Sequence, residues 1–529
     1  MSQLERQDGN GPMPKQIPYI VGTEGCERFS FYGMRNILTP FLISTLLLFM
    51  APEQRAGEAK DIFHTFVIGV YFFPLLGGWL ADRFFGKYDT IFWLSLVYCA
   101  GHACLAIWDD NIKGFYFGLF LIALGSGGIK PLISSFVGDQ FDQTNKNKAK
   151  VVYDAFYWMI NFGSFFASLL MPIFLRDYGP SVAFGIPGLL MFIATLIFWS
   201  GRKKYIHVPP APLDPHSFTR VARTALTTRH PNQGQAGLYV ACFGILSALV
   251  SLAFWQSLGV VIAICLAIVF LIAFGGIGTS MQLERARGIH PDEAVDGVRA
   301  VLRILIVFAL STPFHSLFDQ KASTWIVQAN EMVAPTISLF GNPFTFAPAQ
   351  MQALNPLLVM ILIPFNNLVL YPMLRKMGIE PTPLRRMTTG IAFSGLSWIV
   401  IGAIQVAMDG GTPMSMLWQI LPYALLTFAE VLVSATGLEF AYSQAPRTMK
   451  GVIMAFWFLS ITVGSLWVLI VNKTVRNEGV IARIAESGVS VMAFQMYFFA
   501  AFALVAAAVF GWYATKYKMV DNYRVDAVK

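Results

Sequence analysis

Long apolar segments recur along the whole chain and restrict it to a small set of folds. Of its 529 residues, 56% are hydrophobic and only 13% are charged, which is less charge than soluble domains carry. An apolar run of about 20 residues can cross the hydrocarbon core of a bilayer as an α-helix. The runs are continuous rather than alternating, which argues against a transmembrane β-barrel. We therefore expect an all-α polytopic protein embedded in the lipid bilayer.

The apolar runs number about fourteen and form groups of six, two and six. The two central runs contain no Asp, Glu, Lys, Arg or His, so we expect them to face lipid rather than a polar pathway. The predicted spans are about 18–50, 64–84, 90–108, 115–138, 152–175 and 182–200, then 238–254 and 258–281, then 304–326, 354–374, 388–408, 418–443, 452–471 and 492–513. The corresponding segments are an N-terminal six-helix bundle (1–200), a linker (201–236), two extra helices (237–283), a second linker (284–303) and a C-terminal six-helix bundle (304–529).

Basic residues gather in the loops on one side of these spans. The formal net charge of +8 comes from loops such as 146–150, 202–204 and 375–386, whereas the opposite loop 109–110 is acidic. This distribution follows the positive-inside rule, so it predicts cytoplasmic termini and linkers rather than nucleic-acid binding. Residues 1–16 lack the pattern of a cleavable signal peptide, so we expect the first span to remain in the mature protein, in the cell inner (plasma) membrane.

Charged side chains also fall within these apolar segments, and eight of them stand out. Burying even five of them costs on the order of 10 kcal/mol on insertion scales, so they have to face protein or water. One interpretation is structural salt bridges between helices, but apolar replacements are often as stable as buried ion pairs. The other is proton coupling, which needs buried carboxylates beside cations. The eight are Glu24, Glu27, Arg28, Arg35, Lys130, Asp319, Glu430 and Glu439.

The signs of these charges differ between the two halves of the chain. The first half contributes the cations Arg28, Arg35 and Lys130, and the second contributes three carboxylates. A cavity between the halves would therefore be bipolar and would suit a zwitterion, with its amine near the carboxylates and its carboxylate near the cations. Polar and aromatic residues that could line such a cavity are Tyr32, Tyr71, Tyr157, Asn161, Asn355 and Trp457.

Two local sequences predict how the helices are arranged. Residues 77–87, GGWLADRFFGK, resemble the motif between the second and third helices of the major facilitator superfamily, with Asp82 and Arg83 as a charge pair that stabilises a gate. The glycines of GSGG at 125–128 permit close helix approach, and Pro131 disfavours helical geometry at Lys130.

Four motifs in order resemble those of the proton-dependent oligopeptide transporters (the POT or PTR family of the major facilitator superfamily). They are EGCERFSFY at 24–32, GGIKP at 127–131 with GDQF at 138–141, FYWMINFGS at 156–164, and the group of DQ at 319–320, LNP at 354–356, Glu430 and TGLE at 436–439. The resemblance covers nearly the whole chain, and the extra helix pair is similar to the bacterial branch.

This resemblance implies proton-driven import of di- and tripeptides, and we extend the expected cargo to peptide-like drugs. It implies that Arg28, Arg35 and Lys130 with Tyr32 receive the peptide carboxylate, while Asn161, Asn355 and Glu430 hold the amino terminus. Glu24, Glu27 and Asp319, with Arg28, Lys130 and Glu430, would couple protons; Arg35 and Asp319 would form a gating bridge; Tyr71, Tyr157 and Trp457 would line the site. We expect a monomer with protons as coupling ion and no other cofactor or metal.

Three residues qualify the resemblance. Phe31 stands where the motif has its first Tyr, so one hydroxyl is missing. His315 stands where many members have Trp; one turn before Asp319, it is either a polar lining residue or a group that tunes that carboxyl. His64 matches a position discussed for proton coupling in animal members, but it lies at the predicted mouth of a span.

Other functions remain as alternatives. A membrane enzyme or receptor would need a metal pair, a nucleophile turn or a soluble domain, and the sequence offers none; its five cysteines have no metal or disulfide spacing. A closer alternative keeps the fold and changes the cargo to nitrate, an amino acid or a drug.

Overall fold

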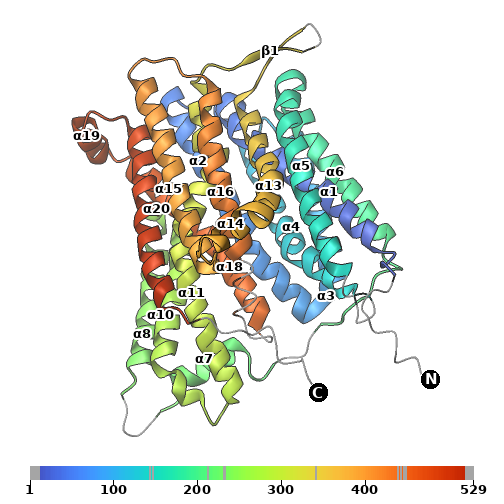
Figure 1. The fold of residues 1–529 in the computed structure, drawn as a ribbon, viewed down its shortest axis with the longest axis vertical. Helices are drawn as coiled ribbons and strands as arrows, with labels where there is room; N and C mark the ends of the chain where they lie inside the picture. Colours follow the sequence, from blue (N-terminus) through green and yellow to red (C-terminus); the bar gives the residue numbers. More distant parts are fainter. Residues whose placement is uncertain are drawn as a thin grey trace.

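The computed structural model describes residues 12–141, 145, 148–210, 214–229, 234–339, 342–437, 440, 444 and 449–518. In this part of the chain, eleven helical stretches are long and apolar enough to cross a membrane, and one of them, Pro52–Ile107, contains two consecutive helices. Two further long helices, α1 (Ile17–Phe41) and α11 (Asp292–Phe318), run alongside these stretches (Figure 1). The all-α membrane fold is therefore confirmed, whereas the count of fourteen spans stays a prediction.

The remaining elements follow in chain order. The first half has α2 (Pro52–Leu80), α3 (Gly86–Ile107), α4 (Ile112–Asp139), α5 (Ala149–Tyr178) and α6 (Pro180–Ser200), and the central part has α7 (Phe218–Thr227), α8 (Ala236–Ala253), α9 (Trp255–Leu258) and α10 (Val260–Gln282). The second half has α12 (Thr324–Asn330), the strands β1 (Thr336–Leu339) and β2 (Asn342–Thr345), α13 (Leu354–Phe365), α14 (Tyr371–Lys376), α15 (Pro383–Asp409), α16 (Ile420–Glu430), α18 (Lys450–Thr474), α19 (Glu478–Glu486) and α20 (Val491–Lys516). Short 3-10 or π-helical turns are η1 (Leu42–Leu46), η2 (Ala81–Phe85), η4 (Leu283–Ala286), η5 (Asp319–Ala322), η6 (Pro348–Ala353), η7 (Asn366–Leu370), η8 (Met416–Gln419) and η9 (Val431–Ala435).

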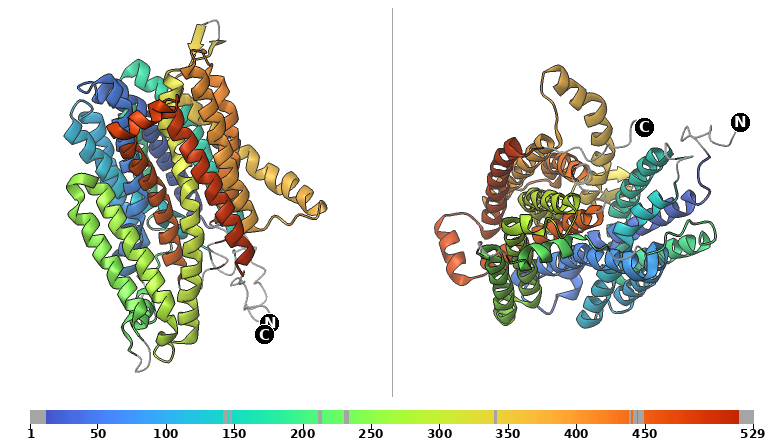
Figure 2. Two further views of the ribbon diagram at one scale, coloured as in Figure 1. Left: turned by 90° about the vertical axis from the view of Figure 1, so that its left-hand side faces the viewer. Right: turned by 90° about the horizontal axis from the view of Figure 1, so that it is seen from below.

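Two helical bundles lie side by side. The buried apolar side chains of α1 to α6 form one cluster, and those of α11 to α20 form two others. The pair α8 and α10 lies on the outside of the bundles, drawn in green in Figure 2. We call the end of the molecule where α1 begins and α20 ends the lower end, and the end with the hairpin of β1 and β2 the upper end, as oriented in Figure 1. The hairpin pairs Thr336 with Thr345.

Two helices begin twelve residues before the predicted spans. Helix α2 starts at Pro52 rather than near 64, and α11 starts at Asp292 inside the predicted second linker. An apolar span marks only the part of a helix in lipid, while the polar ends can continue it into water. The acidic residues of its first turn favour the start of α11, because they face the positive end of the helix dipole.

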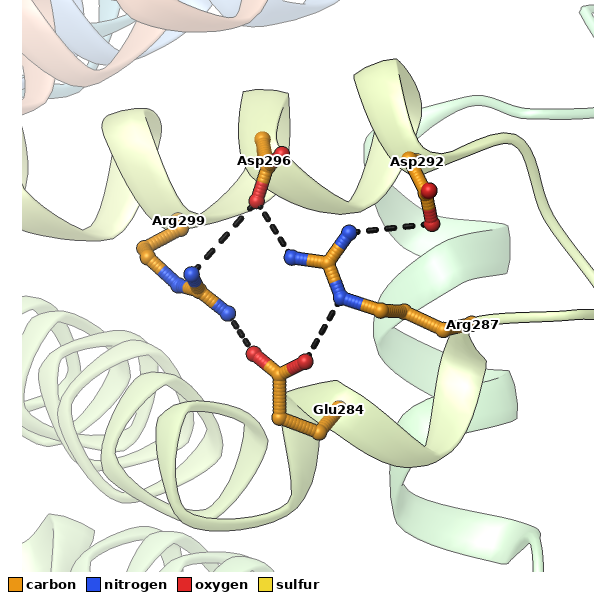
Figure 3. A network of polar contacts seen from close by, with 5 residues as sticks. All are labelled: Glu284, Arg287, Asp292, Asp296 and Arg299. Carbon is orange, nitrogen blue, oxygen red and sulfur yellow. Dashed lines mark hydrogen bonds and ion pairs between the residues drawn. The ribbon is translucent and has the colours of Figure 1, made fainter.

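A surface network of charges also holds the start of α11 (Figure 3). The guanidinium of Arg287 contacts Glu284 at 2.6 Å, Asp292 at 3.0 Å and Asp296 at 2.6 Å, and Arg299 pairs with Glu284 and Asp296. The network thus joins η4, at the end of α10, to α11. The three carboxylates are exposed and the two arginines are partly exposed, so solvent and salt screen the pairs.

Two predicted spans are interrupted where an acidic residue occurs. Helix α11 ends at Phe318, and the turn η5 carries Asp319 before α12 begins. Helix α16 ends at Glu430, and the π-helical turn η9 follows. Irregular backbone at membrane depth is tolerated where it is buried in protein or lines a cavity, so both interruptions point to the interface between the bundles.

The glycines of α4 make the close contacts predicted for them. A Cβ atom at Gly127 would lie 2.6 Å from the backbone of Phe73 on α2, and one at Gly125 would lie 2.7 Å from the backbone of Tyr98 on α3. The predicted departure from helical geometry at Lys130 is wrong, because α4 continues through Pro131. The carbonyl oxygen that Pro131 leaves without its helical donor belongs to Gly127, and it faces Gly77 of α2.

We predict that Gly127→Ala destabilises the protein by about 1–3 kcal/mol, because the new methyl group meets backbone atoms that cannot move aside. Gly275→Ala on α10 is the matched control: nothing lies within 4 Å of its Cβ, so we expect no loss and roughly 0.5–1 kcal/mol of gain. Thermal unfolding in detergent, followed by tryptophan fluorescence, compares the two. Equal midpoints for Gly127→Ala and wild type would contradict the packing described.

Candidate functional site

Three charged side chains on α1 form a buried cluster. The Nε atom of Arg28 lies 2.6 Å from Glu24 Oε1 and 2.8 Å from Glu27 Oε2, and all three residues are less than 9% exposed. Their spacing of three and four residues brings them to one face of the helix, as predicted. Glu24 Oε2 and Glu27 Oε1 have no hydrogen-bond partner among the described residues. Two carboxylates therefore share one guanidinium, and the cluster is one positive charge or one proton short of neutrality.

A second ion pair joins the two bundles. Arg35 Nη2 on α1 lies 2.5 Å from Asp319 Oδ1 on η5, and both side chains are buried. Beside it, the Thr39 hydroxyl donates to the carbonyl of Ala322 at 2.7 Å. The bridge predicted between the halves is thus present in this structure, at the interrupted helix of the second bundle.

His64 makes a further contact between the bundles. Its Nε2 lies 3.0 Å from Ser323 Oγ, and the residue is fully buried. The expectation that it lies at a helix mouth is wrong, because α2 starts twelve residues before it.

The second bundle contributes a polar group that includes a cation. Lys321 Nζ donates to Asn355 Oδ1 at 2.8 Å, and Asn355 Nδ2 donates to Glu430 Oε2 at 2.6 Å. Lys321 is not among the predicted site residues, although it lies two residues after Asp319 in the turn η5. The second bundle therefore supplies a cation as well as the carboxylates expected of it. Glu430 has a cation nearby, and Asp319 is already paired with Arg35.

A polar cavity lies between these groups. Six of its lining residues are predicted site residues, and they come from both bundles. The lining is Tyr32, Arg35, Asn36, Tyr71, Ser164, Ser168, Phe318, Asp319, Lys321, Gln352, Asn355, Pro356 and Glu430. Asn36, Ser164, Ser168 and Gln352 carry no charge inside an apolar run, so the signal that identified the others could not identify them.

Lys130 lies next to this cavity and faces aromatic rings. Its Nζ lies 3.4 Å from the centroid of Phe31 and 5.0 Å from that of Tyr71, which lines the cavity. Among the described residues no ion pair to Lys130 is formed. Phe31 therefore supplies a π-face to the ammonium where the family motif would supply a ring with a hydroxyl.

Several predicted residues lie elsewhere. Trp457 is in the core of the second bundle, packed against Phe308 and His315, and not in the cavity lining. The His315 ring contacts Trp457, and no side-chain contact joins it to Asp319 in the described part of the chain. Asn161 donates to the backbone oxygen of Tyr157, a residue that is 43% exposed.

The residues expected to gate at the turn after α2 are exposed. Asp82 and Arg83 lie on η2, and in the part that the structure describes neither takes part in an ion pair. The charge pair at this turn instead joins Lys87 of α3 to Asp139 of α4 at 2.7 Å. The predicted pair is therefore not seen here, because the π-helical turn directs both side chains outward. Glu439 lies outside the described residues.

Comparison with known proteins assigns the family. The PTR2 profile, described as the POT family, matches residues 88–487. Mouse solute carrier family 15 member 2 is 31% identical over 411 residues, which are 75% of this chain and 50% of that protein, so the chain spans about half the length of the curated relatives it matches. An auto-inhibited POT family peptide transporter superposes with a TM-score of 0.93 at 65% identity, covering 97% of this chain and 99% of the other. The POT family transporter PepTSo gives 0.92 at 64%, covering 96% and 99%. The chain therefore belongs to the POT family.

Proposed function

We propose that this protein is a proton-coupled symporter that imports di- and tripeptides by alternating access. The cavity between the bundles carries the proposal, because Arg35 lines it from one side and Glu430 from the other. The relatives include peptide transporters, which supports the same cargo. A carboxylate aimed at the ligand favours a cargo with an amine over nitrate.

A zwitterionic peptide would lie across the cavity. Its carboxylate would face Arg35, Lys130 and, behind them, Arg28, with Tyr32 as a hydrogen-bond partner. Its amine would face Glu430 and Asn355, which already share a hydrogen bond of 2.6 Å. As the peptide amine binds, it would take the place of the Lys321 ammonium as the cation nearest to Glu430.

Protons would bind to the carboxylates whose negative charge is not fully balanced by a neighbouring cation. Glu24 and Glu27 share the guanidinium of Arg28, so a proton on either carboxylate neutralises the cluster. Asp319 would accept a proton when Arg35 leaves it for the peptide carboxylate. Protonation of a carboxylate would thus release its arginine, and the peptide carboxylate would then pair with that arginine. Protons would be the coupling ion, with no other cofactor.

We also propose the orientation and the setting of the carrier. The basic loops at the lower end, together with the start of α1 and the end of α20, would face the cytoplasm of a cell whose plasma membrane holds the protein. One chain would contain a complete pathway, so we expect a monomer, and peptide-like drugs with both charged ends would be transported as well.

Transport assays in proteoliposomes test the function. We expect uptake of labelled dialanine driven by an inward proton gradient, and counterflow of dialanine without any gradient. Nitrate and free alanine serve as competitors. Absence of dialanine uptake and counterflow, or inhibition by nitrate alone, would contradict a peptide symporter.

We predict that Glu430→Gln weakens dialanine binding by about tenfold or more, because a peptide ammonium would lose its buried anionic partner. N-acetylated dialanine, which has no ammonium, should bind the variant and the wild type equally. Glu478→Gln on the exposed helix α19 is the control and should behave as wild type. Equal losses for both ligands would mean that Glu430 does not hold the amine.

We predict that Glu24→Gln abolishes proton-driven uptake but leaves counterflow intact. Glutamine mimics the protonated carboxyl and leaves Glu27 paired one to one with Arg28, so the cluster on α1 no longer has an excess negative charge for a proton to neutralise. Counterflow should then lose its pH dependence, while Glu293→Gln in the exposed first turn of α11 should keep it. A Glu24→Gln variant that still concentrates dialanine against a gradient would exclude this role.

A further inference from the structure

A chain of hydrogen bonds crosses from one bundle to the other near the upper end, away from the cavity. Lys60 Nζ on α2 donates to Gln495 Oε1 on α20 at 3.4 Å, and Gln495 Nε2 donates to Asn472 Oδ1 on α18 at 2.9 Å. Asn472 Nδ2 donates to Asp61 Oδ1, back on α2, at 3.0 Å. Arg476 Nη2 then lies 2.8 Å from the other oxygen of Asp61.

In this series of hydrogen bonds, each donor faces an acceptor. It begins at an ammonium, passes through two amides that each donate and accept, and ends at a carboxylate. Both amide dipoles are therefore aligned with the field between Lys60 and Asp61, and each bond polarises the next. Lys60, Asn472 and Gln495 are each less than 9% exposed, so water cannot readily take over a broken bond.

Several other hydrogen bonds join the two bundles in the half of the interface toward the upper end. They include the bridge of Arg35 and Asp319, the bond from Gln352 Nε2 to the carbonyl of Asn36, and the bond from Gln350 Nε2 to the carbonyl of Leu169. The structure is therefore closed at the upper end. Opening at the upper end has to break the hydrogen bonds from Lys60 to Gln495 and from Asn472 to Asp61, because α2 belongs to one bundle and α18 and α20 belong to the other.

The central helix pair packs along the same seam. Ile68 of α2 joins an apolar cluster with Ile262 and Cys265 of α10 and Leu466 and Leu469 of α18. Lys473 donates to the carbonyl of Ser257 in α9. Helix α10 thus covers the seam between α2 and α18 on its outer side, next to the buried hydrogen bonds.

We propose that Lys60, Asp61, Asn472, Arg476 and Gln495 form a second upper latch, which acts beside the bridge of Arg35 and Asp319 and which α10 shields from lipid. The bridge lies in the cavity, where a peptide carboxylate can compete for Arg35, whereas this latch has no contact with the cavity lining. It therefore sets how readily the empty carrier opens upward, independently of the peptide. The latch rests on the proposed alternating access of the carrier.

Gln495→Leu tests the latch, because leucine has a similar volume and can neither accept from Lys60 nor donate to Asn472. The full chain, with its five cysteines replaced, carries spin labels at Asp110 and Thr412 on exposed turns at the upper end of each bundle. Pulsed electron–electron resonance then measures their separation in nanodiscs without peptide. We expect the ratio of open to closed upper ends to rise roughly tenfold, as for a buried polar group that loses its partner.

Three further variants sharpen the result. Arg476→Gln removes the half-exposed end of the chain and should have a smaller effect, while Gln54→Leu on the exposed start of α2 should leave the distances as in wild type. Asp61→Asn keeps the shape of the site and should also increase opening, which covers the case in which Gln495→Leu does not fold. Wild-type distances in both Gln495→Leu and Asp61→Asn would overturn the latch. Because no peptide is present, that outcome is separate from a failure of peptide transport.

Discussion

A charge buried in a lipid-embedded helix has to find its partner inside the protein, and this constraint shapes both bundles. Arg28 serves two carboxylates on its own helix, and Arg35 reaches across to Asp319 in the other bundle. The second pair is possible because α11 gives way to a tight turn at Asp319, so that its backbone faces the interface rather than lipid. Without such pairing, each of these charges would cost several kcal/mol in the membrane.

The same constraint gives the proposed carrier its means of coupling. A cavity whose charges are already paired with one another can accept a zwitterion only by exchanging partners, and a proton is the smallest group that replaces a lost cation. Closure at the upper end would then depend on two sets of contacts of different kinds. One set, at Arg35 and Asp319, lies where the ligand would bind. The other set, around Asp61, is covered by α10, and peptide binding would not affect it directly.

The sequence predicts the outline of this arrangement but not its details. Apolar runs reveal the helices, and charges inside those runs identify Glu24, Arg35 and Asp319, because lipid makes such charges expensive. Lys60 was missed because it lies before the apolar part of α2, where a charge looks ordinary. Trp457 was assigned to the cavity, yet packing against neighbouring rings places it in the core. Which face of a helix contacts the other bundle depends on tertiary packing, and it cannot be derived from the hydrophobic pattern of a single sequence.

In the proposed carrier, peptide binding is linked to proton binding at buried carboxylates. Calorimetric titration of the reconstituted protein with dialanine, in buffers of different ionisation enthalpy, counts the protons taken up for each peptide bound. We expect a net uptake of protons at neutral pH that falls in Glu24→Gln and in Asp319→Asn. Peptide binding with no net proton uptake at any pH would contradict it.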